Sequence, residues 1–401
     1  MPIRAKSWSF ATTIPEFTGP FRVGCHDIEL VYKGGMSEGH PEEGSKVAGE
    51  KLSKGLEGLL VRLYYPAEPQ NNHLTSWLPT PMNLYGQGYG DFAKIPKWIS
   101  TPVFVWSLMY TKIPAFLNAP LASDKNRFPV VVFSHGIGCN RSTYSYICGQ
   151  LASAGCVVCA VEHRDGSASF SHVKRKQPLE YVHPVDPSAM EFRREQVKHR
   201  LEEVNACWEL VKKLEDGHLV ENIFEERIDL GQFKGRLDLE NAVMAGHSFG
   251  GCTTIEVLKN PDAPFKVGIT LDPWMEPFLG TPTVTRPLIV INSEGFTKWL
   301  LNFRLVEAMM KNAPKNSRLF TILGSGHQNH SDIPALFPTL SRRFTKSTGP
   351  MDPALALELN ARLIFEFLRQ YVPNIAEKIP VDSKILSDNP TERPVEIQIH
   401  Q

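Results

Sequence analysis

The chain has 401 residues, of which 42% are hydrophobic and 21% are charged, and its 43 basic and 43 acidic side chains give a formal net charge of zero. This composition excludes global disorder, collagen and small disulfide scaffolds, and the length is sufficient to bury a sizeable core. Because a neutral chain has no long-range field that attracts polyanions, we expect no nucleic-acid partner.

The first residues carry basic side chains without the apolar stretch of a secretory signal. We therefore expect a cytoplasmic protein with reduced thiols, without a signal peptide or a transmembrane helix. Residues 1–56 are predicted to be an N-terminal extension that is partly loop. The seven cysteines include Cys156 and Cys159, but this pair lies in an apolar run, which favours a buried strand over a redox or metal site.

Short apolar runs alternate with helical stretches from about residue 57 onward. Several runs are continuously apolar rather than alternating, which is typical of strands buried on both faces of a parallel sheet. The sequence thus predicts an α/β fold in which helices cover both faces of a mostly parallel sheet. The predicted strands are Leu59–Tyr65, Val130–Phe133, Cys156–Val161, Ala242–Ala245, Val267–Leu271, Leu288–Ile291 and Leu319–Leu323.

The segment Ala93–Pro120 is apolar but contains prolines and lysines. It has no uncharged window long enough to cross a membrane as a helix. Two interpretations stay open: a core helix or lid packed on the domain, or an interfacial segment whose apolar side chains enter a lipid surface. The side chains expected to make that contact are Trp98, Trp106, Leu108 and Met109.

Two helices are predicted from spacing and capping. Arg194–Leu214 has apolar residues at helical spacing with charged residues elsewhere, which indicates a surface helix with one buried stripe. Asp352 and Pro353 form a favourable start for a helix to about Tyr371. We therefore predict a single domain over residues 57–375, with an apolar insertion at about 93–120, and a polar tail over 376–401.

The motif Gly246-His247-Ser248-Phe249-Gly250 follows an apolar strand and precedes a helix-forming stretch. This is the strand–turn–helix setting of a nucleophilic serine, and the tight turn requires small residues on both sides of it. A serine hydroxyl needs a base to remove its proton. In folds with this kind of nucleophile turn, the three catalytic residues follow one another along the chain as serine, acid and histidine. His327, in a small-residue loop after a strand, is the predicted base, in preference to His330 and His400.

The acid and the oxyanion donors follow from the strand ends. Asp272 and Glu294 each follow a predicted strand, and the pattern alone leaves both open as the acid that orients His327. The oxyanion donors are predicted to be the N–H groups of Phe249 and Ile137, the latter in the loop after Val130–Phe133. His135 and His247 are interpreted as hydrogen-bonding residues inside the turns.

A family resemblance emerges from several blocks in order. They are Arg62-Leu63-Tyr64-Tyr65-Pro66, Phe133-Ser134-His135-Gly136, Val161-Glu162-His163-Arg164-Asp165-Gly166-Ser167-Ala168, Gly246-His247-Ser248-Phe249-Gly250-Gly251, Leu271-Asp272-Pro273-Trp274-Met275, Ile291-Asn292-Ser293-Glu294 and His327-Gln328-Asn329. Over about residues 59–370 the chain resembles the platelet-activating factor acetylhydrolases, lipase-like serine esterases of intracellular and plasma type. Pro273 and Gly326 depart from the family pattern beside the expected active-site residues, which leaves acyl preference open.

The resemblance implies an α/β-hydrolase that removes short or oxidised sn-2 acyl groups from phospholipids without calcium, cofactor or metal. It implies that Asp272 is the acid, and it places interfacial segments near 93–120 and near Leu336 and Phe337. The charged run Glu162–Asp165 is interpreted as a buried ion network rather than a contact for the lipid headgroup. The alternatives are a general carboxylesterase for small soluble esters and a non-catalytic lipid-binding protein on the same fold.

Overall fold

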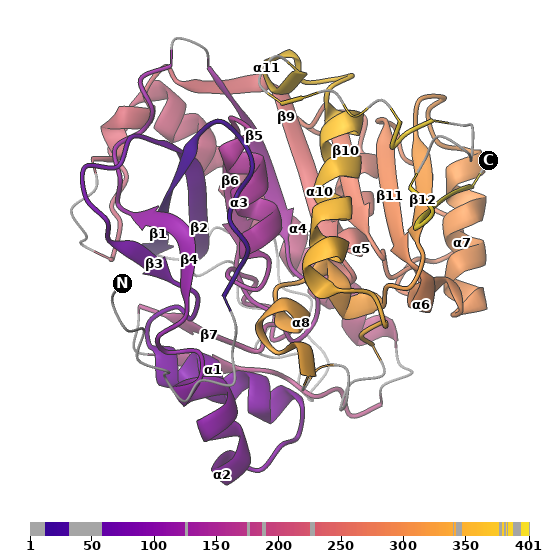
Figure 1. Ribbon diagram of the computed structural model, residues 1–401, viewed down its shortest axis with the longest axis horizontal. Helices are drawn as coiled ribbons and strands as arrows, with labels where there is room; N and C mark the ends of the chain where they lie inside the picture. The colour runs from indigo at the N-terminus through magenta and orange to yellow at the C-terminus, as the bar shows by residue number, and fades with distance from the viewer. Residues whose placement is uncertain are drawn as a thin grey trace, which may run out of the picture.

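The computed structural model describes residues 13–31, 58–124, 127–174, 177–186, 190–224, 229–339, 341, 347–376, 379–380, 382, 384–387 and 394–400. Within these ranges one large sheet organises the fold (Figure 1). Its strands, in spatial order, are β13 (Ile397–His400), β12 (Arg318–Ile322), β11 (Leu288–Ser293), β10 (Val267–Leu271), β9 (Leu237–His247), β5 (Phe128–Ser134), β6 (Val157–Val161), β2 (Gly58–Ala67), β1 (Arg22–Val31), β4 (Lys112–Leu117) and β3 (Leu74–Ser76). A separate antiparallel pair consists of β7 (Phe170–Val173) and β8 (Gln177–Glu180).

Helices cover both faces of this sheet. The helical segments are α1 (Met82–Phe92), α2 (Lys97–Ser100), η2 (Thr101–Trp106), α3 (Ser145–Ser153), α4 (Met190–Asp216), η3 (Leu230–Phe233), α5 (Phe249–Lys259), α6 (Glu294–Thr297), α7 (Leu300–Lys311), η4 (His327–His330), α8 (Ile333–Leu336), α10 (Pro353–Leu368) and α11 (Pro373–Ala376). α3 and α10 contribute to one buried cluster, and α4, α5 and α7 contribute to the other. Among the described residues, none of these helices combines the length and the apolar character that a membrane crossing requires.

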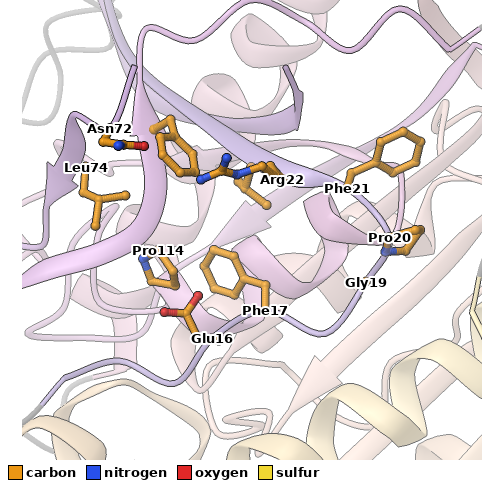
Figure 2. A pocket seen from close by; sticks show the side chains of 11 residues that line it. Glu16, Phe17, Gly19, Pro20, Phe21, Arg22, Asn72, Leu74 and Pro114 are labelled. Carbon is orange, nitrogen blue, oxygen red and sulfur yellow. The ribbon is translucent and has the colours of Figure 1, made fainter. Parts of the chain in front are cut away.

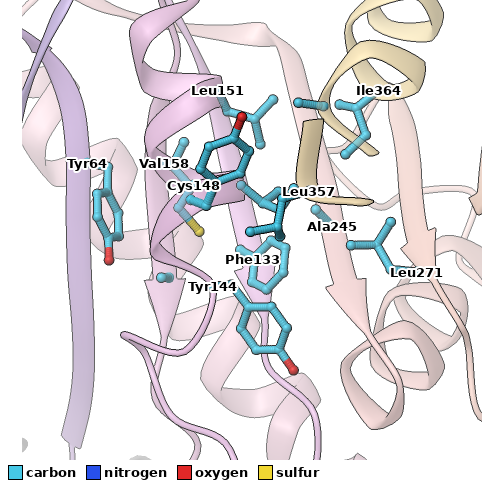
Figure 3. Packing of buried hydrophobic residues seen from close by; sticks show 14 of the residues in the cluster. Tyr64, Phe133, Tyr144, Cys148, Leu151, Val158, Ala245, Leu271, Leu357 and Ile364 are labelled. Atoms are coloured by element: carbon cyan, nitrogen blue, oxygen red, sulfur yellow. The ribbon is translucent and has the colours of Figure 1, made fainter. Parts of the chain in front are cut away.

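The six central strands, from β12 through β6, run parallel and are almost fully buried. Successive side chains of a strand point to opposite faces, so Val131 and Phe133 join the cluster under α3 and α10 while Val130 and Val132 join the other. Figure 3 shows Phe133 packed with Leu151 and Cys148 of α3 and Leu357 of α10. The predicted parallel sheet, and each strand predicted from an apolar run, are therefore confirmed.

Both predicted helices are present. α4 includes the predicted Arg194–Leu214, and its stripe of Val204 and Val211 is buried against the sheet. α10 begins as its sequence predicts, because the Asp352 carboxylate accepts the N–H groups of Ala354 and Leu355 at 2.9 and 3.1 Å.

The sheet extends past the predicted limits at residues 57 and 375, so those limits are too narrow. β1 lies in the predicted extension and pairs antiparallel along the length of β2, from Arg22 opposite Ala67 to Val31 opposite Gly58. β13 lies in the predicted tail and pairs antiparallel with β12. β4, at the end of the predicted insertion, is likewise a sheet strand beside β1. β1 and β13 mix polar and apolar residues, and a search for continuous apolar runs does not detect such strands.

Candidate active site

Ser248 lies in the sharp turn between β9 and α5, at the carboxyl end of the parallel strands. Its φ of 57° and ψ of −116° are rare for a non-glycine residue, and such strain costs about 1–3 kcal/mol. A Cβ on Gly250 would lie 1.9 Å from the carbonyl oxygen of Ser134, and a Cβ on Gly246 would lie 2.2 Å from that of Gly250. Both glycines thus supply the space that the turn requires, as the sequence predicted.

Three of the predicted residues form one hydrogen-bonded chain. The Nε2 atom of His327 lies 3.0 Å from Ser248 Oγ, and its Nδ1 atom lies 2.9 Å from Asp272 Oδ2. His327 begins the η4 turn, which follows β12, and its ring stacks on Phe296 with centroids 4.6 Å apart and planes 11° apart. This geometry allows the imidazole to accept the serine proton while the carboxylate orients it.

Asp272 is buried at the end of β10, with a left-handed backbone at φ 43°. Its two oxygens also accept the Ser293 N–H and the Ser293 hydroxyl, each at 2.6 Å. Burial by itself would raise the pKa of Asp272, but the imidazoles of His330 and His327 lower that pKa well below its usual range. The carboxylate is therefore ionised and held on both sides.

Glu294, the rival acid, points elsewhere. Its Oε2 atom accepts the N–H of Gly324 at 2.7 Å, and its Oε1 atom lies 2.7 Å from Lys298 Nζ. His400, the tail histidine, lies in β13 with its Nε2 atom 2.8 Å from Thr321 Oγ1. Neither residue contacts the Ser248–His327–Asp272 chain through these groups, so the structure brings together the predicted set that contains Asp272.

The predicted oxyanion donors lie at the base of the same turn. Phe249 is the first residue of α5, where an N–H has no carbonyl one turn earlier to accept it. Ile137 packs with Phe249 and Trp274 in a small apolar cluster. The neighbouring Gly136 N–H is taken by the Tyr144 hydroxyl at 3.2 Å. The N–H groups of Phe249 and Ile137 therefore remain the predicted donors for a developing negative charge.

The turn histidines have the structural roles predicted for them. His247 Nδ1 lies 2.7 Å from the Tyr144 hydroxyl, and His135 Nε2 accepts the His163 N–H at 3.1 Å. Burial is the main cause that lowers the pKa of both His135 and His247 well below the usual range. Both imidazoles are therefore neutral and serve to hold the loops.

The charged run after β6 forms a buried ion network, as the sequence favoured. Its four side chains are paired as follows: Glu162 with Arg141 at 2.5 Å, His163 with Glu203 at 2.6 Å, Arg164 with Glu29 at 2.5 Å, and Asp165 with Arg200 at 2.9 Å. Glu162, His163 and Asp165 are at most 1% exposed, so they cannot meet a headgroup directly.

Arg200 is a site residue that sequence reasoning missed. The prediction that the charged positions of this helix face solvent is wrong for Arg200 and Glu203, which are 0% and 1% exposed. Arg200 Nη1 donates to the His135 carbonyl at 2.7 Å, and its guanidinium lies 4.4 Å from the Phe249 ring centroid. Arg200 thus contacts both halves of the predicted oxyanion site. Arg200 lies one helical turn after Gln196 and Val197, beside the apolar stripe, and this position was the feature of the sequence that could have indicated its burial.

Three potential metal-ligating side chains lie close together at this site. Among the described residues, His247, Asp272 and His327 place potential ligand atoms within 4.8 Å of one another. However, His327 and Asp272 bond each other, and His247 Nδ1 bonds Tyr144. The donor set fits proton transfer better than metal binding, because both carboxylate oxygens accept hydrogen bonds.

Comparison with known proteins assigns a family. Residues 7–389 match the family described as "Platelet-activating factor acetylhydrolase, isoform II". The chain belongs to this acetylhydrolase family. Platelet-activating factor acetylhydrolases from Gallus gallus and Cavia porcellus are each 30% identical over 381 and 373 residues, covering 90% of this chain and 83% and 78% of theirs.

A solved structure supports the fold of this acetylhydrolase family member. A ferulic acid esterase from Streptomyces cinnamoneus superposes with a TM-score of 0.70 at 17% identity, covering 98% of this chain and 100% of the esterase. At that identity the likeness establishes the α/β-hydrolase fold alone. The predicted fold class and the predicted family are both confirmed.

The apolar residues expected at a lipid surface divide into two groups. Trp98 and Trp106, on α2 and η2, are 78% and 62% exposed, and Met109 is half-buried. Leu108 and Leu336 are 0% exposed and Phe337 is 2% exposed, so predicting lipid contact for these three was wrong. The cause is tertiary packing: all three belong to the main core, where the Phe337 ring lies 5.9 Å from that of Phe104.

A separate hollow of about 410 Å³ lies beside β1 and β4 (Figure 2). Its walls include Phe17, Phe21, Leu74 and Pro114, with Arg22 stacked 4.1 Å above the Phe116 ring. None of its lining residues belongs to the Ser248 site. We assign this hollow no part in the chemistry.

Proposed function

We propose that this protein is a serine esterase that hydrolyses the sn-2 acetyl or short or oxidised acyl ester of phospholipids such as platelet-activating factor. The observation that carries the proposal is the hydrogen-bonded chain from Ser248 through His327 to Asp272, at a strained turn, in a member of this family. A non-catalytic lipid-binding protein would not need such a chain in the order serine, acid, histidine.

The proposed reaction has two halves. Ser248 Oγ attacks the ester carbonyl while His327 Nε2 takes its proton, and the negative charge on the carbonyl oxygen is met by the N–H groups of Phe249 and Ile137. The bond to the glycerol oxygen then breaks, and His327 returns the proton to the lysophospholipid alkoxide. A water molecule, deprotonated by His327, attacks the acyl-enzyme, releases the carboxylic acid and restores Ser248.

Asp272 stabilises the imidazolium that forms in each half of the reaction. Its Oδ1 atom also accepts the Ser293 N–H and its Oδ2 atom accepts the Ser293 hydroxyl, and both bonds hold the carboxylate in its orientation toward His327. Because an imidazole activates the nucleophile and N–H groups hold the oxyanion, the reaction requires no calcium, metal or cofactor. We propose a cytoplasmic location, which the seven free cysteines support: all are buried, and burial raises the pKa of Cys156 to about 12.

We propose that the enzyme approaches lipid through a peripheral contact at Trp98 and Trp106. Their exposed rings are amphipathic and suit the headgroup boundary of a bilayer. A chain with zero net charge has little long-range attraction to an anionic membrane. The contact is therefore local and mainly hydrophobic, with half-buried Met109 at its edge.

The test is a hydrolysis panel. Phosphatidylcholines with sn-2 chains from acetyl to palmitoyl, and oxidised chains, are compared with a small soluble ester for wild type and Ser248→Ala. We expect hydrolysis of the short and oxidised chains and loss of at least 10³-fold in Ser248→Ala. Hydrolysis of the soluble ester alone would instead identify a general carboxylesterase, and failure of a fluorophosphonate to label Ser248 would refute the enzyme assignment.

The surface contact is tested separately on vesicles of phosphatidylcholine. The double variant Trp98→Ala/Trp106→Ala should lose at least about tenfold more activity on vesicles than on the soluble ester, since full burial of even one such ring is worth about 1.5–3 kcal/mol and about 1.4 kcal/mol corresponds to tenfold. Leu219→Ala, at a side chain that is 91% exposed elsewhere, is the matched control and should lose neither activity. Equal losses on both substrates would exclude the interfacial role.

A further inference from the structure

A second histidine reaches the Asp272 carboxylate. His330 lies in the same η4 turn as His327 and is 0% exposed. Its Nε2 atom lies 3.3 Å from Asp272 Oδ2, the oxygen that also receives His327 Nδ1. One buried carboxylate oxygen is therefore shared by two imidazoles.

The opposite side of the His330 ring determines where its protons are. The Asn360 side-chain N–H group donates to the Ala356 carbonyl at 2.7 Å, which fixes the amide so that Oδ1 faces His330 Nδ1 at 2.9 Å. An amide oxygen only accepts, so Nδ1 must carry a proton. A neutral imidazole has one N–H, and its other nitrogen would then present a lone pair to the carboxylate.

That alternative is costly in a dry site. A lone pair facing an ionised carboxylate repels it, and burial prevents water from separating the two. A second proton on His330 Nε2 converts the repulsion into an ion pair. The contact is at ion-pair distance but lacks the alignment of a hydrogen bond, since Nε2 has no hydrogen-bond partner.

The surroundings leave Asp272 as the partner for this charge. His330 contacts Asp272 at the end of β10, His247 at the end of β9 and Asn360 of α10. The η4 turn also packs against β11 and α8, and the charged residue at the start of α8 is Asp332. Burial, together with His327 and His330, lowers the pKa of His247 well below its usual range, so His247 is neutral. Asp332 is engaged with Trp77 Nε1 at 2.8 Å and with the Ser145 and Tyr146 N–H groups at 2.7 and 3.0 Å.

We propose that His330 is a positioning residue, an imidazolium that shares the Asp272 carboxylate with His327 and makes His327 harder to protonate. Part of the Asp272 charge is offset by His330, so less of it stabilises a proton on His327. The base then stays free to accept the Ser248 proton at lower pH. This role rests on the proposed function, because it assumes that His327 is the base.

The first experiment measures the rate at which a fluorophosphonate labels Ser248 between pH 4 and 9, in the full-length protein. His330→Gln and His330→Phe remove the positive charge with and without a polar replacement. In both variants the acid limb of the labelling rate should move to higher pH by about one unit, as expected for loss of a charge at this range. Gln328→Ala, a half-buried residue of the same turn, is the control and should leave the limb in place.

The second experiment measures directly whether the His330 ring carries a positive charge. In protein labelled with ¹⁵N-histidine, the His330 signals, assigned by their absence in His330→Gln, should show both ring nitrogens protonated at pH 7. An acid limb that stays within 0.2 of a unit, or an unprotonated Nε2, overturns the proposal. If Ser248 of the wild type is never labelled, the proposed function fails instead, and the nitrogen spectrum still decides the charge of His330. If a variant does not fold, the wild-type spectrum carries the test.

Discussion

Arg200 offers the sharpest test of how the fold supports the oxyanion site. Its side chain is 0% exposed, its Nε atom pairs with Asp165 Oδ2 at 2.9 Å, and its Nη2 atom donates to Ser167 Oγ at 2.6 Å. The same guanidinium donates to His135 O and lies over the Phe249 ring. We predict that Arg200→Ala destabilises the fold and slows catalysis.

The magnitude follows from these contacts. Removing Arg200 leaves the Asp165 carboxylate buried without its cation, and breaking a buried ion pair in this way costs about 3–5 kcal/mol. The loop that carries Ile137 also loses the anchor on His135. Loss of an entire oxyanion donor costs about 10²–10³ in rate, so a displaced donor should cost about 10–100-fold in kcat. Arg200→Lys keeps the positive charge but loses the planar guanidinium that donates to several acceptors at once. This variant should lose about half as much unfolding free energy as Arg200→Ala.

Urea unfolding and turnover of a short-chain ester measure the two effects. The matched control is Arg194→Ala in the same helix, where the side chain is 27% exposed and pairs with Glu191. That exposed pair is worth about 0–1 kcal/mol and should leave kcat unchanged. The reasoning is refuted if Arg200→Ala is as stable as Arg194→Ala, or if kcat stays at the wild-type value in folded Arg200→Ala.

Further predictions concern the turn, the acid and the pH dependence of stability. Gly250→Ala should cost at least about 1–3 kcal/mol by urea unfolding, because the new methyl group would overlap Ser134 O, and an unchanged midpoint would contradict this. Ser293→Ala removes a hydroxyl donor from Asp272, and should lower kcat about tenfold with little change in KM for the soluble ester; a change in KM alone would contradict it. Burial opposes ionisation of Asp27, but two arginines hold its pKa well below its usual range. A lowered folded-state pKa adds stability above the unfolded value of about 4, and this stability is lost as pH falls, so Asp27→Asn should flatten the acid side of the stability curve.

The buried strands of the fold could be predicted because each one is a short, continuous run of apolar residues in the sequence. Runs such as Val267–Leu271 are apolar throughout, and only strands covered on both faces need that composition. β1, which precedes residue 57, escaped detection because polar residues interrupt its apolar ones, and it is recognised only by its pairing with β2. A strand that mixes polar and apolar residues in this way resembles a loop in sequence.

Some features of the candidate site could likewise be predicted from the sequence, and others could not. The two glycines around Ser248 are required by the tight turn, so Ser248 could be predicted as the candidate nucleophile from its neighbours in sequence. The strand pattern alone left Asp272 and Glu294 both open, because each follows an apolar strand, and the family resemblance favoured Asp272. The structure shows which carboxylate meets His327, since Asp272 lies 2.9 Å from its Nδ1 atom while Glu294 accepts the Gly324 N–H. Exposure was likewise undecidable locally, as Leu108 and Trp106 lie two residues apart and one is buried while the other is 62% exposed.

The amino-acid sequence alone was enough to predict the parallel sheet, the turn around Ser248, the histidine that follows β12 and the family. These depend on backbone sterics and hydrophobic burial, which act over a few neighbouring residues. The partners of the buried charges became known from the folded structure: Arg200 contacts the predicted oxyanion loop, Ser293 donates to Asp272, and His330 is a second imidazole beside the same carboxylate. A zero net charge says nothing of these pairs, because the energy of a buried charge depends on what lies within a few ångströms across the fold.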